Sequence, residues 1–293
     1  MPLHVFYNPN QSAPSDSYSP SAGKPQKVIA DWLEHFGDRI EIVASDAVSR
    51  NMLALAHTRR YVDGVLDLKL KNGFGDKSPE TAASLPYTTG SMLAAATHLL
   101  INRGKPQLEF RVACSPTSGF HHAGYDDGGG YCTFNGLVVT AQALHERGLA
   151  KRVAILDFDQ HYGDGTDEII RRLELEHIVH ITAGKGYDRD PSLITKLKAQ
   201  VKSWIDGPMP VDIVLYQAGA DAHVDDPLGG WLTTEQMTKR DRQVFEACAE
   251  CDIPVVWNLA GGYQRDEHGG IEPVLALHRN TMRVCLDVFG LAR

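Results

Sequence analysis

Ionisable residues of this 293-residue chain collect directly after four short apolar runs. Buried charges are costly unless they are paired or bound to a metal, so a packed core would not gather so many of them. We therefore expect a catalytic site that contains a metal. The residues concerned are His121 and His122 after the first run, Asp157, Asp159, His161 and Asp164 after the second, Asp221 after the third, and Tyr263 after the fourth.

The segment 157–164 (DFDQHYGD) carries the most specific of these patterns. Asp157, Asp159 and His161 alternate, so in extended backbone their side chains point to one side. Asp159, His161 and Asp221 together offer two carboxylate oxygens and one imidazole nitrogen. Three protein ligands with an open position are what a catalytic zinc ion needs. An iron(II) ion with similar ligands stays open as an alternative.

The remaining polar residues suit supporting roles. Asp157 and Asp164 can accept a hydrogen bond from a histidine N–H and so fix the tautomer of that histidine. Adjacent histidines are poorly placed to bind one metal through equivalent geometry, so we interpret His121 and His122 as proton-transfer groups beside a water molecule at the metal. Tyr263 follows two glycines, which allow a close turn, and its phenol could donate to a developing oxyanion.

The elements that would position these residues alternate between apolar runs and amphipathic segments. Continuous apolar strands alternating with helices indicate a parallel sheet covered on both faces, and ligands of such sheets bind outside the carboxyl ends of the strands. Two Gly/Ser/Pro-rich segments, 12–24 and 71–84, are predicted as long loops. The expected strands are 3–7, 110–114, 153–158, 178–181, 213–216 and 255–259, and the expected helices are 89–102, 135–146, 167–175, 192–204, 234–251 and 271–289.

Composition restricts the class of protein. The apolar share of 43% and the charged share of 23% are ordinary for a globular enzyme. The net charge of -8 disfavours nucleic acid as a partner but is compatible with cationic substrates. No run of ~20 apolar residues and no leader pattern at residues 1–11 are present, so we expect no membrane span and a cytoplasmic location. Cys248 and Cys251 lack a second ligand pair and are interpreted as packed thiols.

Four motifs, in this order along the chain, resemble the histone deacetylase superfamily, which includes acetylpolyamine amidohydrolases and bacterial deacetylase-like amidohydrolases. The resemblance implies an arginase-like three-layer α/β/α fold with a central, mostly parallel sheet, and a single catalytic domain over residues 1–293. It also implies a zinc-dependent amidohydrolase, a deacetylase that removes acyl groups from lysine side chains or similar amines. The motifs are GFHHAGYDDGGGYCTFNG (119–136), LDFDQHYGDGT (156–166), GADAHVDDPLGG (219–230) and LAGGY (259–263), with weaker likeness at 55–65 and 85–100.

The resemblance also implies individual catalytic roles. It selects the same three metal ligands as the spacing does, with one Zn2+ ion per chain. It pairs His121 with Asp157, and His122 with Asp164, and it makes His122 the general base and acid. Tyr263 would polarise the amide carbonyl together with the zinc ion.

Contacts around this centre are implied in the same way. Gly130 and Tyr131 would form the wall of a narrow tunnel for an acyl-lysine-like chain, and Asp76 would hold the substrate backbone at the rim. Departures from the family pattern, such as Phe120 before the histidine pair and Tyr162 after the ligand histidine, remove no catalytic group. A structural potassium ion is also implied, near Asp157, Asp159, His161 and Thr182.

Two other functions are kept as alternatives. An acetylpolyamine amidohydrolase would carry an insertion that narrows the tunnel and usually pairs subunits, and the short stretch 104–120 has little room for one. This favours an acyl-lysine protein, a peptide or a small acylated amine, and leaves a homo-oligomer open. A non-catalytic metal-binding module is disfavoured by the intact histidine pair and Tyr263. The other histidines are assigned structural, surface or loop roles: His57, His98, His145, His177, His180, His223, His268 and His278.

Overall fold

The computed structural model describes residues 1–105, 110–186 and 191–291, and within them seven parallel strands form one sheet. Their order across the sheet is β2-β1-β3-β7-β6-β4-β5. The four central strands, β3, β7, β6 and β4, are buried along their whole length, as expected for a parallel sheet covered on both faces. The strands are β1 (Leu3–Tyr7), β2 (Ile40–Ala44), β3 (Val112–Ser115), β4 (Val153–Asp157), β5 (Ile178–Thr182), β6 (Ile213–Gly219) and β7 (Val255–Ala260).

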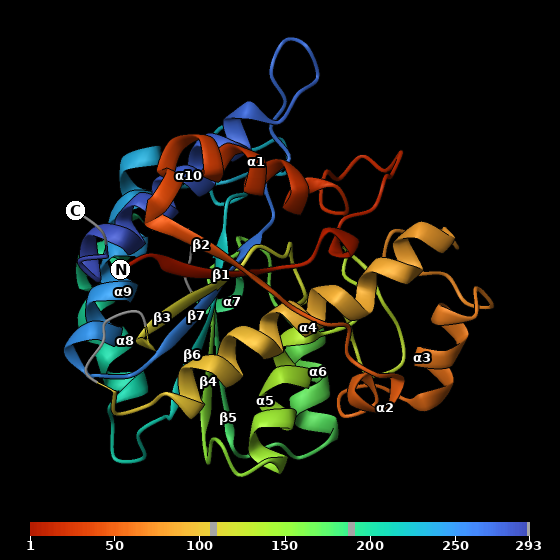
Figure 1. Cartoon of the computed structure of the whole chain (residues 1–293), viewed down its shortest axis with the longest axis horizontal. Helices are drawn as coiled ribbons and strands as arrows, with labels where there is room; N and C mark the ends of the chain where they lie inside the picture. The colour runs from red at the N-terminus through yellow and green to blue at the C-terminus, as the bar shows by residue number, and fades with distance from the viewer. Residues whose placement is uncertain (106–109, 187–190, 292–293) are drawn as a thin grey trace.

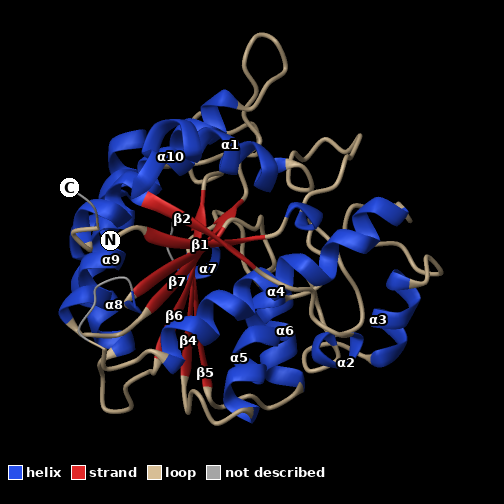
Figure 2. Cartoon of the chain, viewed as in Figure 1, coloured by secondary structure: helices blue, strands red, loops and turns tan. Residues whose placement is uncertain are grey.

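Helices cover both faces of the sheet, which gives three layers (Figures 1 and 2). Apolar side chains accordingly form two core clusters, one around Trp32 and Trp257 and the other around Met92 and Leu99. Among the described residues, no helix is long and apolar enough to cross a membrane. One face carries α1 (Lys24–Phe36), α8 (Leu197–Ile205), α9 (Thr234–Glu250) and α10 (Glu272–Val288). The other face carries α4 (Pro79–Ile101), α5 (Gly136–Glu146) and α6 (Asp164–Arg172). The short helices α2 (Arg50–Leu53), α3 (Arg59–Leu66) and α7 (Ala183–Gly186) belong to neither set.

All six expected strands are present, with small shifts at their ends. The chain also forms β2, which the sequence analysis did not predict. This strand lies at the edge of the sheet, and of its five residues only Ile40 is fully buried, so its apolar pattern is weak. Because every strand is parallel to its neighbours, all carboxyl ends lie along one edge of the sheet.

Helix α4 corrects the prediction of a long loop over residues 71–84. It begins at Pro79 rather than at Thr89. The Ser78 side chain accepts a hydrogen bond from the Thr81 N–H, and Pro79 occupies the first turn, where a missing N–H is harmless. The one proline of this segment, Pro79, thus starts a helix, which also accommodates Pro86 in its interior.

Helix α1 was not predicted either, although its sequence carries a signal. Val28, Ile29, Trp32 and Phe36 recur at helical spacing, and all four are buried against the sheet. The helix begins at the last residue of the segment 12–24. The rest of that segment is irregular as predicted, except for a turn at residues 21–23.

Candidate metal centre and catalytic site

Asp159, His161 and Asp221 meet at the carboxyl ends of β4 and β6. One ligand atom from each lies within 4.8 Å of the ligand atoms of the other two. The Nδ1 atom of His161 is 3.0 Å from Asp159 Oδ1 and 2.9 Å from Asp221 Oδ2. Both carboxylates are buried, and His161 is partly exposed. The arrangement offers two oxygens and one nitrogen to a cation, with one side open to the site.

The charge at this centre suits a bound cation. Asp221 Oδ2 is buried, and its close polar neighbour is the Nδ1 atom of His161, itself one of the three candidate ligands. Burial, together with the nearby Asp159 carboxylate, raises the pKa of Asp221 to about 8. A divalent cation between the two carboxylates would compensate both the burial and the mutual repulsion. The residues therefore fit a metal ion.

Two glycines allow the loops of this centre to approach each other. A Cβ atom on Gly261 would lie 2.3 Å from Asp221 Cγ, and one on Gly219 would lie 2.4 Å from Asp159 Cα. Gly261 also has a φ of +49°, which side chains other than glycine rarely adopt. The first of the two glycines before Tyr263 is thus required by the position of Asp221.

His121 is buried beside a buried carboxylate. Its Nδ1 lies 2.7 Å from Asp157 Oδ2, while Asp157 Oδ1 accepts hydrogen bonds from Gln217 Nε2 (2.8 Å) and from the Asp159 N–H (3.1 Å). Burial lowers the pKa of His121, but Asp157 and Asp159 outweigh it and raise that pKa to about 9. Without a metal ion at the centre, His121 is therefore positively charged at neutral pH.

His122 has the opposite environment. Its Nδ1 lies 2.6 Å from Oδ1 of Asp164, whose side chain is 62% exposed. Burial and the neighbouring His121 lower the pKa of His122. Its ring centroid is 4.1 Å from that of His121 and 5.9 Å from that of His161, so an uncharged imidazole lies beside the metal centre. A Cβ atom on Gly130 would lie 2.4 Å from His122 Cδ2, which explains a glycine at that position.

Tyr263 lies between this centre and the surface. Its N–H donates to Asp226 Oδ2 at 2.8 Å, and its ring packs against Tyr131 (centroids 5.9 Å apart) and Tyr18 (6.2 Å). Burial and the carboxylates of Asp159 and Asp221 raise the pKa of Tyr263, so the phenol stays protonated. Asp226 lies within the motif 219–230, but the sequence analysis assigned it no role.

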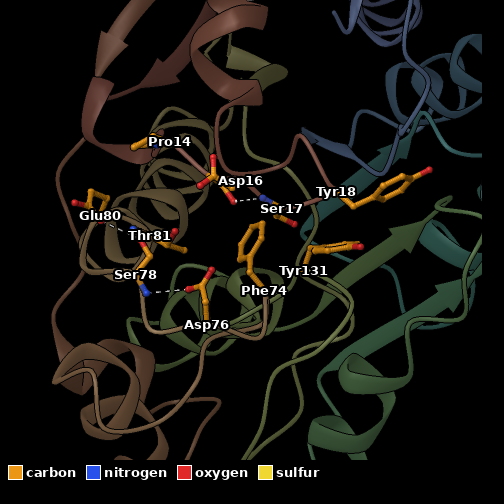
Figure 3. Close-up of a pocket in the computed structure, with 11 residues that line it drawn as sticks. Pro14, Asp16, Ser17, Tyr18, Phe74, Asp76, Ser78, Glu80, Thr81 and Tyr131 are labelled. Carbon is orange, nitrogen blue, oxygen red and sulfur yellow. Dashed lines mark hydrogen bonds between the residues drawn. The ribbon is translucent and has the colours of Figure 1, made fainter. Parts of the chain in front are cut away.

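A cavity of about 850 Å³ opens beside Tyr18 and Tyr131 (Figure 3). We call its lining residues Asp16, Tyr18, Phe74, Asp76, Glu80 and Tyr131 the mouth. Tyr131 connects the mouth to the metal centre, because its ring lies 5.8 Å from Phe74 and 5.9 Å from Tyr263. Asp76 is among the residues that line the cavity, and its Oδ1 accepts hydrogen bonds from Asn72 Nδ2 (2.6 Å) and the Ser78 N–H (2.9 Å). Its contact with a substrate stays a prediction.

Lys24 is a charged residue of the site that the sequence analysis missed. It is fully buried in the first turn of α1, and its Nζ donates to the Gly261 carbonyl at 2.5 Å. Burial lowers the pKa of Lys24 to about 8, although Asp221 and Asp159 oppose this shift. Nothing in the local sequence marks this lysine as buried, because its carbonyl partner lies 237 positions away.

The predicted potassium neighbours also lie together. Thr182 is paired in register with Asp157, and its Oγ1 accepts a hydrogen bond from the Gly163 N–H at 3.1 Å. The ion itself stays a prediction. His223 Nε2 lies 2.9 Å from Thr234 Oγ1, at the start of α9, and Cys248 is a buried free thiol.

Solved structures share this fold. The HD domain of HDA15 superposes with a TM-score of 0.74 and 19% identity, covering 99% of this chain and 95% of that one. An acetylpolyamine aminohydrolase from Burkholderia pseudomallei superposes with a TM-score of 0.70 and 18% identity, covering 98% of this chain and 99% of that one. The chain therefore has the arginase/deacetylase-like α/β/α fold.

The sequence places the chain in a family. The histone deacetylase domain matches residues 21–183 and 174–272, and this chain belongs to that family of hydrolases. Acetylpolyamine amidohydrolase 1 of Pseudomonas aeruginosa is 38% identical over 75% of this chain and 67% of its own length. A Picosynechococcus protein is 30% identical over 78% of this chain and 81% of its own length. The chloroplastic histone deacetylase 10 of Oryza sativa is 28% identical over 83% of this chain, which spans 66% of that relative.

Proposed function

We propose that residues 1–293 act as one catalytic domain, a zinc-dependent deacylase that hydrolyses the amide bond of acylated lysine side chains or similar amines. One observation carries this proposal. The cation-binding set of Asp159, His161 and Asp221 lies beside an uncharged His122 and a protonated Tyr263. The five free cysteines support a reducing, cytoplasmic location.

Zinc, when bound by these three residues, supplies Lewis acidity for the amide carbonyl and makes a water molecule more acidic. The imidazole of His122 takes a proton from the attacking water, because its Nδ1 is engaged by Asp164 and its Nε2 is left for the reaction. His122 then returns the proton to the leaving amine. The Tyr263 phenol donates a hydrogen bond to the oxyanion that develops from the carbonyl.

The charged His121 has a different task in this scheme. Asp157 holds its proton, and the resulting cation lies beside His122 and Asp159. It therefore favours the negative charge that develops on the substrate and keeps His122 uncharged before the reaction. A potassium ion near Asp157 and Thr182 is proposed as structural support.

The mouth favours amines that carry further positive charge. Asp16, Asp76 and Glu80 are exposed around it, and Tyr18, Phe74 and Tyr131 offer aromatic faces. An acetylpolyamine has such a charge, and the relative from Pseudomonas aeruginosa is named for this activity. Acetylpolyamine amidohydrolase is therefore the second candidate. The insertion argument against it concerns residues 104–120, of which 106–109 lie outside the described residues.

Hydrolysis of a fluorogenic acetyl-lysine peptide, measured beside acetylputrescine with and without chelator, tests the proposal. Chelator-sensitive cleavage of the peptide, restored by zinc, is the expected result. Preference for acetylputrescine would promote the second candidate. Cleavage of neither substrate by protein shown to contain zinc would contradict both.

A further inference from the structure

We propose that Arg240 is a positioning residue that fixes the spacing between the metal ligands Asp159 and Asp221. The inference rests on the proposed metal site. Arg240 lies on α9, outside the catalytic pocket, and no function has been assigned to it above. Its side chain is 1% exposed, in contrast to most arginines, which lie at the surface.

The guanidinium joins the two loops that carry these ligands. Its Nη1 donates one hydrogen bond to the Phe158 carbonyl (3.1 Å) and another to the Gly219 carbonyl (2.8 Å). Phe158 immediately precedes Asp159, and Gly219 lies two residues before Asp221. One nitrogen atom thus crosslinks the carboxyl ends of β4 and β6.

These loop ends are in close contact, which makes their spacing sensitive. The Phe158 N–H donates to the Gln217 carbonyl at 3.0 Å, and a Cβ atom on Gly219 would lie 2.4 Å from Asp159 Cα. Two carbonyl oxygens that point at the same place repel each other unless a donor lies between them. Arg240 provides that donor, and without it one or both buried carbonyls would lose a partner.

A second set of contacts fixes the orientation of Arg240. Its Nε and Nη2 both lie 2.8 Å from Asp241 Oδ1. Asp241 in turn accepts hydrogen bonds from the Tyr216 hydroxyl and from Thr281 Oγ1. The planar fork of arginine can face Asp241 on one edge and the two carbonyls on the other, and the ammonium of lysine cannot match this geometry.

A structural role alone would predict something different. A buried ion pair that only anchors α9 would lower the stability of the whole protein and leave the metal site of the folded molecule intact. A positioning role predicts that the two loops loosen and that the metal binds more weakly. Residues that orient metal ligands from behind typically change metal affinity 10- to 100-fold when mutated.

Arg279 offers a matched control. It is an arginine of α10 that is paired with the largely buried Asp31 through Nε (3.1 Å) and with Glu272 (2.9 Å), and these partners lie in neither metal loop. Comparing R240M with R279M therefore separates the loss of a buried ion pair from the loss of the crosslink.

Two measurements on the full chain test the inference. In metal-free protein, hydrogen exchange of residues 157–161 and 219–223 should accelerate in R240M and not in R279M. In a competition titration with a chromophoric chelator, the zinc affinity should fall roughly 10- to 100-fold in R240M and remain unchanged in R279M. R240K keeps the charge without the fork and should show an intermediate loss; it replaces R240M if that variant does not fold.

The outcomes separate this inference from the proposed function. Unchanged loop exchange and zinc affinity in a folded Arg240 variant would overturn the positioning role, even if stability fell. A wild-type protein that does not bind zinc would contradict the proposed function, and the exchange experiment would still decide whether Arg240 holds the two loops together.

Discussion

The metal centre and the mouth differ in how their charges are held. At the centre, Asp159 is 3% exposed and Asp221 fully buried, and both come from loops that begin at the ends of central strands. At the mouth, Asp16 and Glu80 are exposed and come from an irregular segment and a helix start. Both regions are acidic, but water screens the charges only at the mouth.

This difference determines how much each residue can contribute. In a buried site, a charge or donor acts at nearly full strength and its loss is not replaced by solvent. At an exposed mouth, a single carboxylate contributes little and salt weakens it. The centre should therefore control the rate of the reaction and the mouth should only modulate the choice of substrate.

The largest expected effect separates the two adjacent histidines within the centre. H122Q should lower kcat about 100- to 10,000-fold, because it removes the proposed general base. Its stability should change little, since its partner Asp164 is exposed. H121Q should lose both rate and stability, because it removes the closest charged partner of the buried Asp157 and leaves only the more distant His180.

Steady-state kinetics and thermal unfolding of both variants check this prediction. Equal losses of stability in H121Q and H122Q would contradict the different environments of the two residues. Restored activity of H122Q in buffers that contain imidazole would further support a proton-transfer role.

The next largest effect concerns the tyrosine at the border of the two regions. Y263F keeps the ring packing with Tyr18 and Tyr131 and removes only the hydroxyl. We expect kcat to fall on the order of 100-fold or more while zinc content stays the same. Y131F is the matched control, because it removes a hydroxyl on the mouth side of the same ring contact. Full activity of Y263F would exclude an oxyanion role for the phenol.

The two regions also differ in how far the sequence predicts them. The centre could be predicted, because parallel strands bring their carboxyl ends to one edge and D-x-D-x-H follows such a strand. The mouth could be predicted only in part. The family resemblance implied roles for Asp76 and Tyr131, whereas Asp16 and Glu80 lie in segments without a periodic apolar pattern. Helix α4 was predicted too short over this region, so Glu80 was assigned to a loop.

Two buried cations show a further limit of sequence reasoning. Lys24 and Arg240 have residue types that are usually exposed, and Arg240 lies within a helix whose span was predicted well. Their partners are carbonyls far away in the chain, such as Gly261 for Lys24 and Phe158 for Arg240. Such contacts depend on tertiary packing, which periodicity and spacing do not report.

Acid stability tests the support beneath the metal centre. His57 Nε2 accepts a hydrogen bond from the Asn135 N–H (2.8 Å), and its Nδ1 lies 2.8 Å from the carbonyl of Gly124, two residues after His122. Burial lowers the pKa of His57 from 6.5 to about 4. Between pH 6.5 and pH 4, His57 binds a proton in the unfolded chain but not in the folded chain. The free energy of unfolding therefore decreases as the pH is lowered through this range, by about 3 kcal/mol in total.

Urea unfolding from pH 7 to pH 4 measures this fall. H57Q can donate to Gly124 and accept from Asn135 without titrating, so the difference in stability between wild type and H57Q should shrink by about 3 kcal/mol as the pH decreases. A difference that does not vary with pH would show that His57 is not held uncharged.

The smallest effect is expected at the mouth, where it separates attraction of a charged substrate from catalysis. The double variant D16N/E80Q removes two exposed carboxylates and leaves Asp76, which organises residues 72–78 through its own hydrogen bonds. We expect kcat/KM for acetylputrescine to fall about two- to fivefold at low salt, with less change at high salt. The uncharged analogue N-butylacetamide has a similar length and should be unaffected. An equal loss for both substrates would mean that the mouth acts on the reaction itself, and the division between a rate-controlling centre and a selective mouth would then be wrong.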